Sequence, residues 1–185
     1  MTYKEIAIQK YRNIIQELKL ESPPLNARVE RADGSGRNGY QYGETVVLFD
    51  CTAIEDIDAV WRHELAHWLL NKSYAFNSHH DRYFIAASAA MHMGWQEYES
   101  SSYLTVDALH FKKDNSSADV SNEVAAAKAI YYETQASSVE EQVEKIAQIY
   151  YKENQTTTKR FEHAAGWGAV IFISCFILVL GAGVI

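Results

Sequence analysis

The sequence predicts an α+β fold in which a small antiparallel sheet packs against a central helix, with further helices behind it. Strand-like patterning is clearest over residues 27–50, whereas helical periodicity dominates on either side. A third observation is an uncharged C-terminal run with the length of a membrane-spanning helix. We therefore expect a compact domain over residues 1–117, a helical connector over 118–158 and a transmembrane anchor over 164–185.

The first predicted helix covers residues 2–20 and should end before Pro23 and Pro24. Its apolar residues recur at helical spacing, which predicts that one face of the helix lies on the core. These residues are Ile6, Tyr11, Ile14, Ile15 and Leu18.

A β-hairpin is predicted next. Residues 27–32 (ARVERA) and 40–50 (YQYGETVVLFD) have strand-like composition, and the turn-forming run DGSGRNG separates them. The apolar run from Val46 to Phe49 is the expected buried strand. Its edge offers a place where an extended peptide could lie.

Two helices follow and hold a group of histidines between them. A helical pattern begins near Glu55 and contains the run HELAH at residues 63–67. After a polar loop at residues 71–78, an alanine-rich pattern continues from Asp81 to Gly94.

The following segment is less regular. Residues 103–111 (YLTVDALHF) fit a strand and a short helix equally well. Helical patterns return at residues 119–134 and 138–153, the second with Ser138 and Glu141 spaced as a capping box. These two helices form the predicted connector.

The C-terminal run lies beyond the last charged residue, Glu162. At roughly 1.5 Å per residue, residues 164–185 make about 33 Å of helix, enough to cross a bilayer core of about 30 Å. The N-terminus does not resemble a secretory signal, and Lys159 and Arg160 precede the apolar run. The sequence thus predicts a single-pass membrane protein whose N-terminal domain faces the cytoplasm.

Charge and cysteine content narrow the class of protein. The net charge of −7 argues against a broad basic surface for nucleic acid, although a local patch has a few candidates. These candidates are Arg28, Arg31, Arg37, Lys112 and Lys113. Cys51 and Cys175 are too few and too far apart for a disulfide framework, which favours a reducing compartment.

The HELAH run has the composition of a metal site. Residues four apart on a helix point the same way, so His63 and His67 can both present a ring nitrogen to one ion. A catalytic zinc takes three protein ligands and leaves a position for water, which the metal acidifies. Glu64 would accept the proton of that water and pass it to the leaving group. The run therefore predicts a zinc-dependent hydrolase, given a third ligand.

The third ligand must come from elsewhere in the chain. We prefer His80, because it lies a short loop beyond the motif and at the start of the next helix. His79, one residue away, is its direct competitor. The other candidates are Asp81, His92, Glu97 and Glu99.

The remaining histidines and Asp81 have plainer interpretations. Asp81 suits a helix N-cap, or a hydrogen-bond acceptor that fixes the tautomer of a ligating histidine. His92 suits a core or surface position on the second helix. His110 and His163 lie in no comparable context.

The layout of these residues resembles the SprT-like zincins and the related WLM-type metallopeptidases. In those families HExxH is followed, after a short loop, by a third histidine, and a phenylalanine often stands four residues beyond it. Here HELAHW is followed by HHDRYF, with Phe84 four residues after His80. The resemblance covers residues 46–95, about a quarter of the chain. His79 replaces the glycine common in SprT-like proteins, and their zinc-ribbon cysteines are absent.

The resemblance implies a compact zincin-like domain with His63, His67 and His80 as Zn²⁺ ligands and Glu64 as general acid and base. The expected function is hydrolysis of peptide bonds in a protein or peptide substrate by a membrane-anchored metallopeptidase. The alternative is a catalytically inert zincin scaffold that binds a partner through residues 119–153. A DNA-associated protease rests on family analogy alone, and a zinc hydrolase of another bond also fits the motif.

Overall fold

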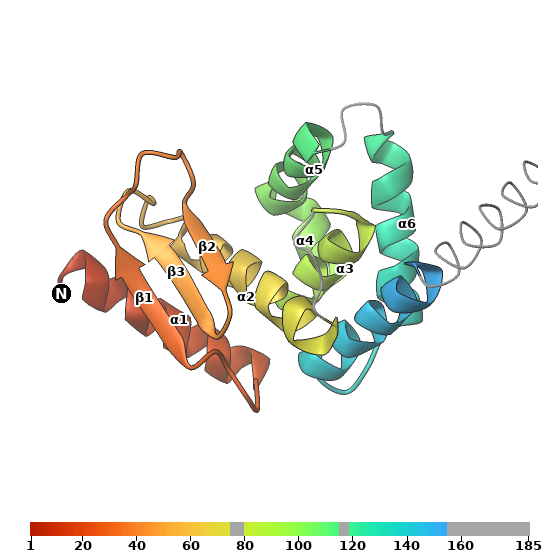
Figure 1. Cartoon of the computed structure of the whole chain (residues 1–185), viewed down its shortest axis with the longest axis horizontal. Coiled ribbons are helices and arrows are strands. Elements are labelled where there is room, and N and C mark those ends of the chain that lie inside the picture. The colour runs from red at the N-terminus through yellow and green to blue at the C-terminus, as the bar shows by residue number, and fades with distance from the viewer. Residues whose placement is uncertain (75–79, 115–118, 155–185) are drawn as a thin grey trace, which may run out of the picture. The chain divides into compact units, whose positions relative to one another are not determined.

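The computed structural model of the chain describes residues 1–74, 80–114 and 119–154 (Figure 1). The chain divides into two units, Met1–Gln148 and Ile149–Ile185. The sheet, the labelled helices and the residues of the candidate site all belong to the first unit. The elements are α1 (Tyr3–Leu18), β1 (Asn26–Glu30), β2 (Gly39–Tyr42), β3 (Thr45–Phe49), α2 (Ile57–Tyr74), α3 (Arg82–Met91), α4 (Trp95–Ser100), α5 (Ser102–Asp114) and α6 (Val120–Glu133), followed by a helix over residues 139–154.

The three strands form a mixed sheet in the order β1-β3-β2, not the expected antiparallel one. β1 pairs with β3 in parallel and β2 pairs with β3 antiparallel. Residues 46–49 are buried and lie in the central strand β3, which has a neighbour on each side. The predicted strand edge at Phe49 is therefore wrong, and β2 is an edge strand of this sheet.

The hairpin also lies elsewhere than predicted. Tyr42 pairs with Thr45, so only Gly43 and Glu44 connect β2 to β3, and Gly43 has a positive φ of 53°. A two-residue turn with glycine in this conformation suits a tight hairpin. The longer run DGSGRNG instead connects β1 to β2, across the width of the sheet.

Helix α2 lies between the sheet and helix α3. It contacts β2 and β3 on one side and α3 on the other, as Figure 1 shows. The Trp61 indole N–H donates to the Ala7 carbonyl of α1 at 2.9 Å. The guanidinium of Arg62 donates to the Met91 carbonyl at the end of α3 and to Glu17 of α1. These bonds fix α2 between α1 and α3.

Helix α6 lies within the range of the expected helical connector, residues 118–158. Helix α6 packs along α3, and Arg82 of α3 forms a two-point ion pair with Glu123 of α6 at 2.6 and 2.9 Å. The buried side of α6 includes Ala127 and Ile130. The ring centre of Tyr131 lies 5.9 Å from that of Trp95 of α4. Burial of these apolar groups makes α6 part of the folded unit. The ambiguous residues 103–111 belong to helix α5.

The membrane part of the expected fold class is also corrected. Among the helices of the described ranges, none has the length and apolar character needed to cross a bilayer. The predicted anchor at residues 164–185 lies outside the described residues, as do Lys159 and Arg160.

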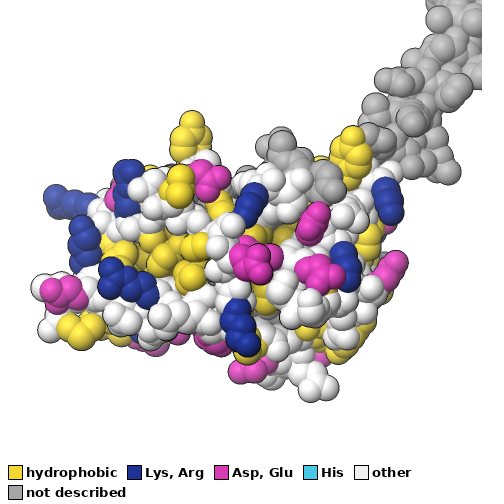
Figure 2. Space-filling model, turned by 90° about the horizontal axis from the view of Figure 1, so that it is seen from below, with side chains coloured by type: hydrophobic (Ala, Val, Ile, Leu, Met, Phe, Trp, Pro, Cys, Tyr) yellow, Lys and Arg dark blue, Asp and Glu magenta, His cyan; other side chains and the backbone are white. Residues whose placement is uncertain are grey.

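Both signs of charge are present on the face of the molecule shown in Figure 2. The candidates for a basic patch come from separate elements, with Arg28 on β1 and Lys112 and Lys113 at the end of α5. Arg37 forms an exposed ion pair with Asp33 at 3.0 Å.

Candidate metal centre

The histidines of the HELAH run point to the same side of α2. The Nε2 atoms of His63 and His67 are 3.2 Å apart, as expected for side chains one helical turn apart. Leu65 and Ala66, between them, are fully buried. The apolar positions thus hold α2 in the core while the histidine positions face a cleft.

His80 joins this pair from the segment before α3. Its Nε2 atom lies 3.1 Å from Nε2 of His63. The next residue, Asp81, caps α3 by accepting hydrogen bonds from the backbone N–H groups of Tyr83 and Phe84, which confirms the predicted N-cap. The cap fixes where α3 begins and so places His80 beside α2. His79 lies outside the described residues.

Phe84 packs against all three histidine rings. It stacks on His67 with the ring centres 4.2 Å apart and meets His63 and His80 edge-on at 4.8 Å. Phe84 is fully buried, so it forms an apolar wall behind the three rings. This contact gives a physical role to the phenylalanine four residues after His80.

His63, His67 and His80 lie close enough to hold one metal ion. Their ligand nitrogens all lie within 4.8 Å of one another. Imidazole nitrogens about 2.0 to 2.1 Å from a tetrahedral ion are about 3.4 Å apart, close to the spacings found here. The donor set therefore fits a divalent ion that accepts imidazole ligands.

Asp107 of α5 orients His63. Its Oδ1 atom lies 3.0 Å from Nδ1 of His63, while Oδ2 accepts hydrogen bonds from Ser88 at 2.8 Å and Tyr98 at 2.5 Å. The carboxylate thereby favours a proton on Nδ1 and leaves the Nε2 lone pair for an ion. Burial alone would raise the pKa of Asp107, but the bonds from His63, Tyr98 and Ser88 hold it below its usual value.

The protonation of the histidines follows from their surroundings. Burial and the neighbouring imidazoles hold the pKa of His67 well below its ordinary value, so its ring is neutral, as a metal ligand must be. Burial opposes a charge on His63 as well, but its bond to Asp107 outweighs this and raises the pKa of His63. Among the described residues, the buried Nδ1 atom of His67 has no hydrogen-bond partner.

Glu64 lies beside the three histidines, against the sheet. It is only 5% exposed, and burial raises the pKa of its carboxyl to about 7, while His63 and Arg37 act in the opposite direction. A Cβ atom added to Gly39 of β2 would lie 3.0 Å from Oε1 of Glu64. Gly39 therefore allows β2 to lie directly on the part of α2 that carries the carboxylate.

The site opens into a cleft of about 530 Å³. The cleft is lined on one side by residues 35–41, from the β1–β2 connection and β2, and on the other by one face of α5. The α5 face consists of residues spaced at helical intervals: Tyr103, Val106, Asp107, His110 and Lys113. The histidines and Glu64 lie between these two walls.

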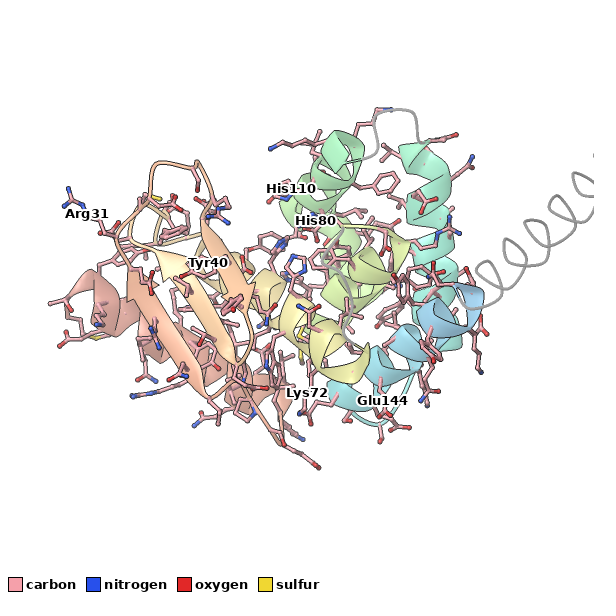
Figure 3. All side chains as sticks on the ribbon, viewed as in Figure 1. Arg31, Tyr40, Lys72, His80, His110 and Glu144 are labelled. Atoms are coloured by element: carbon pink, nitrogen blue, oxygen red, sulfur yellow. The ribbon has the colours of Figure 1, made fainter. Side chains whose placement is uncertain are left out.

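Sequence reasoning missed two residues of the site, and both lie on α5. Asp107 was not a candidate, and His110 was set aside, yet His110 Nδ1 lies 3.4 Å from His80 Nε2. Figure 3 shows His80 and His110 next to each other, with Tyr40 on the sheet side. Asp107 and His110 are three residues apart, a spacing that puts two side chains on the same face of a helix. The sequence would indicate this pair only if residues 103–111 were assigned to a helix.

The other candidate ligands are not part of the histidine cluster. His92 is 8% exposed and stacks on Tyr98 and Tyr103, with ring centres 5.5 and 4.4 Å away. Glu99 pairs with Lys128 at 3.1 Å. The cluster that could hold an ion comprises His63, His67 and His80 and does not include Glu97. His163 lies outside the described residues.

Comparisons with protein-family models, with curated proteins and with solved structures found no match to this chain.

Proposed function

We propose that this protein is a zinc-dependent hydrolase that cleaves peptide bonds. One observation carries the proposal: the Nε2 atoms of His63, His67 and His80 converge in a cleft beside the buried carboxylate of Glu64. Three imidazoles with a neighbouring glutamate form the set of groups that hydrolytic zinc sites use. Zinc is the proposed metal because neutral imidazole suits it and because the three-ligand set leaves a position open.

The chain's own groups have separate roles in this proposal. A bound zinc ion would act as a Lewis acid that acidifies water and polarises a carbonyl group. Glu64 takes a proton from the attacking water and returns it to the leaving amine. Asp107 keeps His63 in the tautomer that ligates. Phe84 excludes water from behind the three rings.

The position of β2 supports a peptide as substrate. β2 is an edge strand, and its residues Gly39, Tyr40 and Gln41 line the cleft. An extended peptide can add to such an edge through main-chain hydrogen bonds, which requires no particular side-chain sequence. Strand addition at β2 would bring a peptide bond into the cleft that holds Glu64 and the histidines.

The test is replacement of Glu64 by Gln in the full-length chain. Zinc content should stay at about one per chain, because Glu64 is not a ligand, whereas hydrolysis of a mixture of quenched fluorescent peptides should fall by at least about 100-fold. Glu55→Gln is the matched control and should behave like the wild type. Unchanged cleavage by Glu64→Gln, or a wild-type chain that takes up no zinc, would refute the proposal.

The inert-scaffold alternative receives no support from the helices that suggested it. The apolar sides of α6 and of the helix over residues 139–154 contribute buried residues to the first unit, among them Ile130, Val143 and Ile146. These side chains are occupied within the fold, so they do not form a ready partner surface.

A further inference from the structure

A fourth histidine stands next to the cluster, on an element that contributes none of the other three. His110 of α5 places Nδ1 3.4 Å from Nε2 of His80, with the ring centres 4.7 Å apart. Its ring centre lies 5.9 Å from that of His63. His110 is exposed and lines the cleft, and Figure 3 shows it beside His80.

Three of the separations between these ring nitrogens are close to those of ligands around one ion. They are 3.2 Å for His63 to His67, 3.1 Å for His63 to His80 and 3.4 Å for His80 to His110. Ligand nitrogens of a tetrahedral zinc ion lie about 3.4 Å apart. His110 thus lies at ligand spacing from His80, next to the group of His63, His67 and His80 whose ligand atoms all lie within 4.8 Å of one another.

The position of His110 is fixed by the same helix that orients His63. Asp107 lies three residues earlier on α5, on the same face, and is held by His63, Ser88 and Tyr98. Residues three apart on a helix are neighbours, so anchoring Asp107 also holds His110 beside the cluster. The approach of α5 to the metal site is therefore built into the packing of the helices.

We propose that His110 is a fourth metal-binding residue, which ligates through Nδ1 and closes the site from the α5 side. This inference rests on the metal site of the proposed function. With His110 bound, the position that three ligands leave open is filled, so hydrolysis requires water as a fifth ligand, a coordination number that catalytic zinc reaches in the transition state. The exposed His110 is the outermost of the four rings, whereas His67 is buried.

The experiment uses the metal-free full-length chain and Co²⁺ as the probe metal. Wild type, His110→Ala and His110→Gln are titrated with Co²⁺, with the visible absorption bands and the dissociation constant as readouts. Both variants should still bind one ion, with altered bands and at least about tenfold weaker binding, since even an outer-shell partner is worth about 10- to 100-fold. Leu109→Ala, an exposed neighbour on the same helix, is the matched control and should match the wild type.

Three comparisons decide the outcome. If both His110 variants bind Co²⁺ with the wild-type affinity and spectrum while His63→Ala and His80→Ala lose it, His110 is not a ligand and only this inference fails. If His63→Ala and His80→Ala also bind Co²⁺ with the wild-type affinity, both the proposed metal site and the role of His110 are refuted. X-ray absorption on the zinc-loaded wild type needs no variant: four imidazoles per zinc support the proposal, and three overturn it.

Discussion

Gly39 of β2 lies so close to Glu64 of α2 that no side chain fits between them. An added Cβ would lie 2.5 Å from the Val47 carbonyl oxygen and 2.9 Å from Cγ1 of Val60, which forces a shift, and 3.0 Å from Glu64 Oε1, which is a tight contact. Gly39→Ala should therefore shift β2 relative to β3 and to the Glu64 carboxylate. We expect a loss of about 1 to 3 kcal/mol in the free energy of unfolding. Peptide cleavage should fall by at least about tenfold with zinc retained.

Gly43→Ala is the matched control for this variant. Gly43 has a positive φ and nothing within 4 Å of an added Cβ, so its substitution strains the backbone without reaching the site. It should lower stability while leaving cleavage per folded molecule unchanged. Cleavage by Gly39→Ala at the wild-type rate would show that the contact between β2 and Glu64 does not matter for catalysis.

His80, and not His79, should be the third ligand. His80 Nε2 lies 3.1 Å from His63 Nε2. Zinc content of the purified full-length chain should drop to near zero for His80→Ala and stay at about one per chain for His79→Ala. The reverse pattern would assign the ligand to His79.

Asp107→Asn should weaken zinc binding by about 10- to 100-fold, since a partner that fixes the tautomer of a ligating histidine has an effect of this size. The zinc affinity of each variant is measured by competition with a chelator of known affinity. Asp58→Asn, which changes a carboxylate on α2 that pairs with Lys10, is the control and should bind zinc normally. If Asp107→Asn and Asp58→Asn bind zinc with equal affinity, Asp107 has no role in metal binding.

His92 should make the metal-free protein sensitive to acid. Burial is the main cause that lowers the pKa of His92 from 6.5 to about 4; Arg62 and His63 act in the same direction, and Asp107 opposes them. As the pH falls, His92 takes up a proton in the unfolded chain before it does so in the folded chain. The contribution of neutral His92 to the free energy of unfolding is therefore complete above about pH 6.5 and is lost as the pH falls toward 4. At about 1.4 kcal/mol per pH unit, the loss amounts to at most about 3 kcal/mol.

Urea unfolding of wild type and His92→Phe at pH 7 and pH 5 tests this prediction. Phenylalanine keeps a ring against Tyr98 and Tyr103 but cannot take up a proton. The variant should lose less stability than the wild type between the two pH values, and Tyr103→Phe should keep the wild-type difference. Identical losses for wild type and His92→Phe would mean that His92 is not the titrating group.

The part of the site that local pattern encodes could be predicted. His63 and His67 are brought together by helical geometry alone, and His80 follows within one short loop. The N-cap at Asp81 was predictable for the same reason, since a cap depends only on the next few residues.

The rest depends on contacts between segments far apart in the sequence. Asp107 and His110 reach the histidines only because α4 and α5 pack against α3, and the residue pattern of α5 alone fits a strand as well as a helix. The parallel pairing of β1 with β3 does not follow from the sequence, because the seven-residue run DGSGRNG is a stronger turn signal than the two-residue turn at Gly43 and Glu44. Strand order is set by packing on α2, which no local signal reports.

Asp107 also connects the histidine cluster to α4, a helix that contributes no residue to the lining of the cleft. Its carboxylate joins Ser88 of α3 and Tyr98 of α4 to His63 of α2. Whatever loosens these helices, such as removal of the Tyr98 hydroxyl, must then weaken the hold on an ion. By thermodynamic linkage the ion in turn stabilises the helices, so metal occupancy would report on the folding of the entire helical half of the unit.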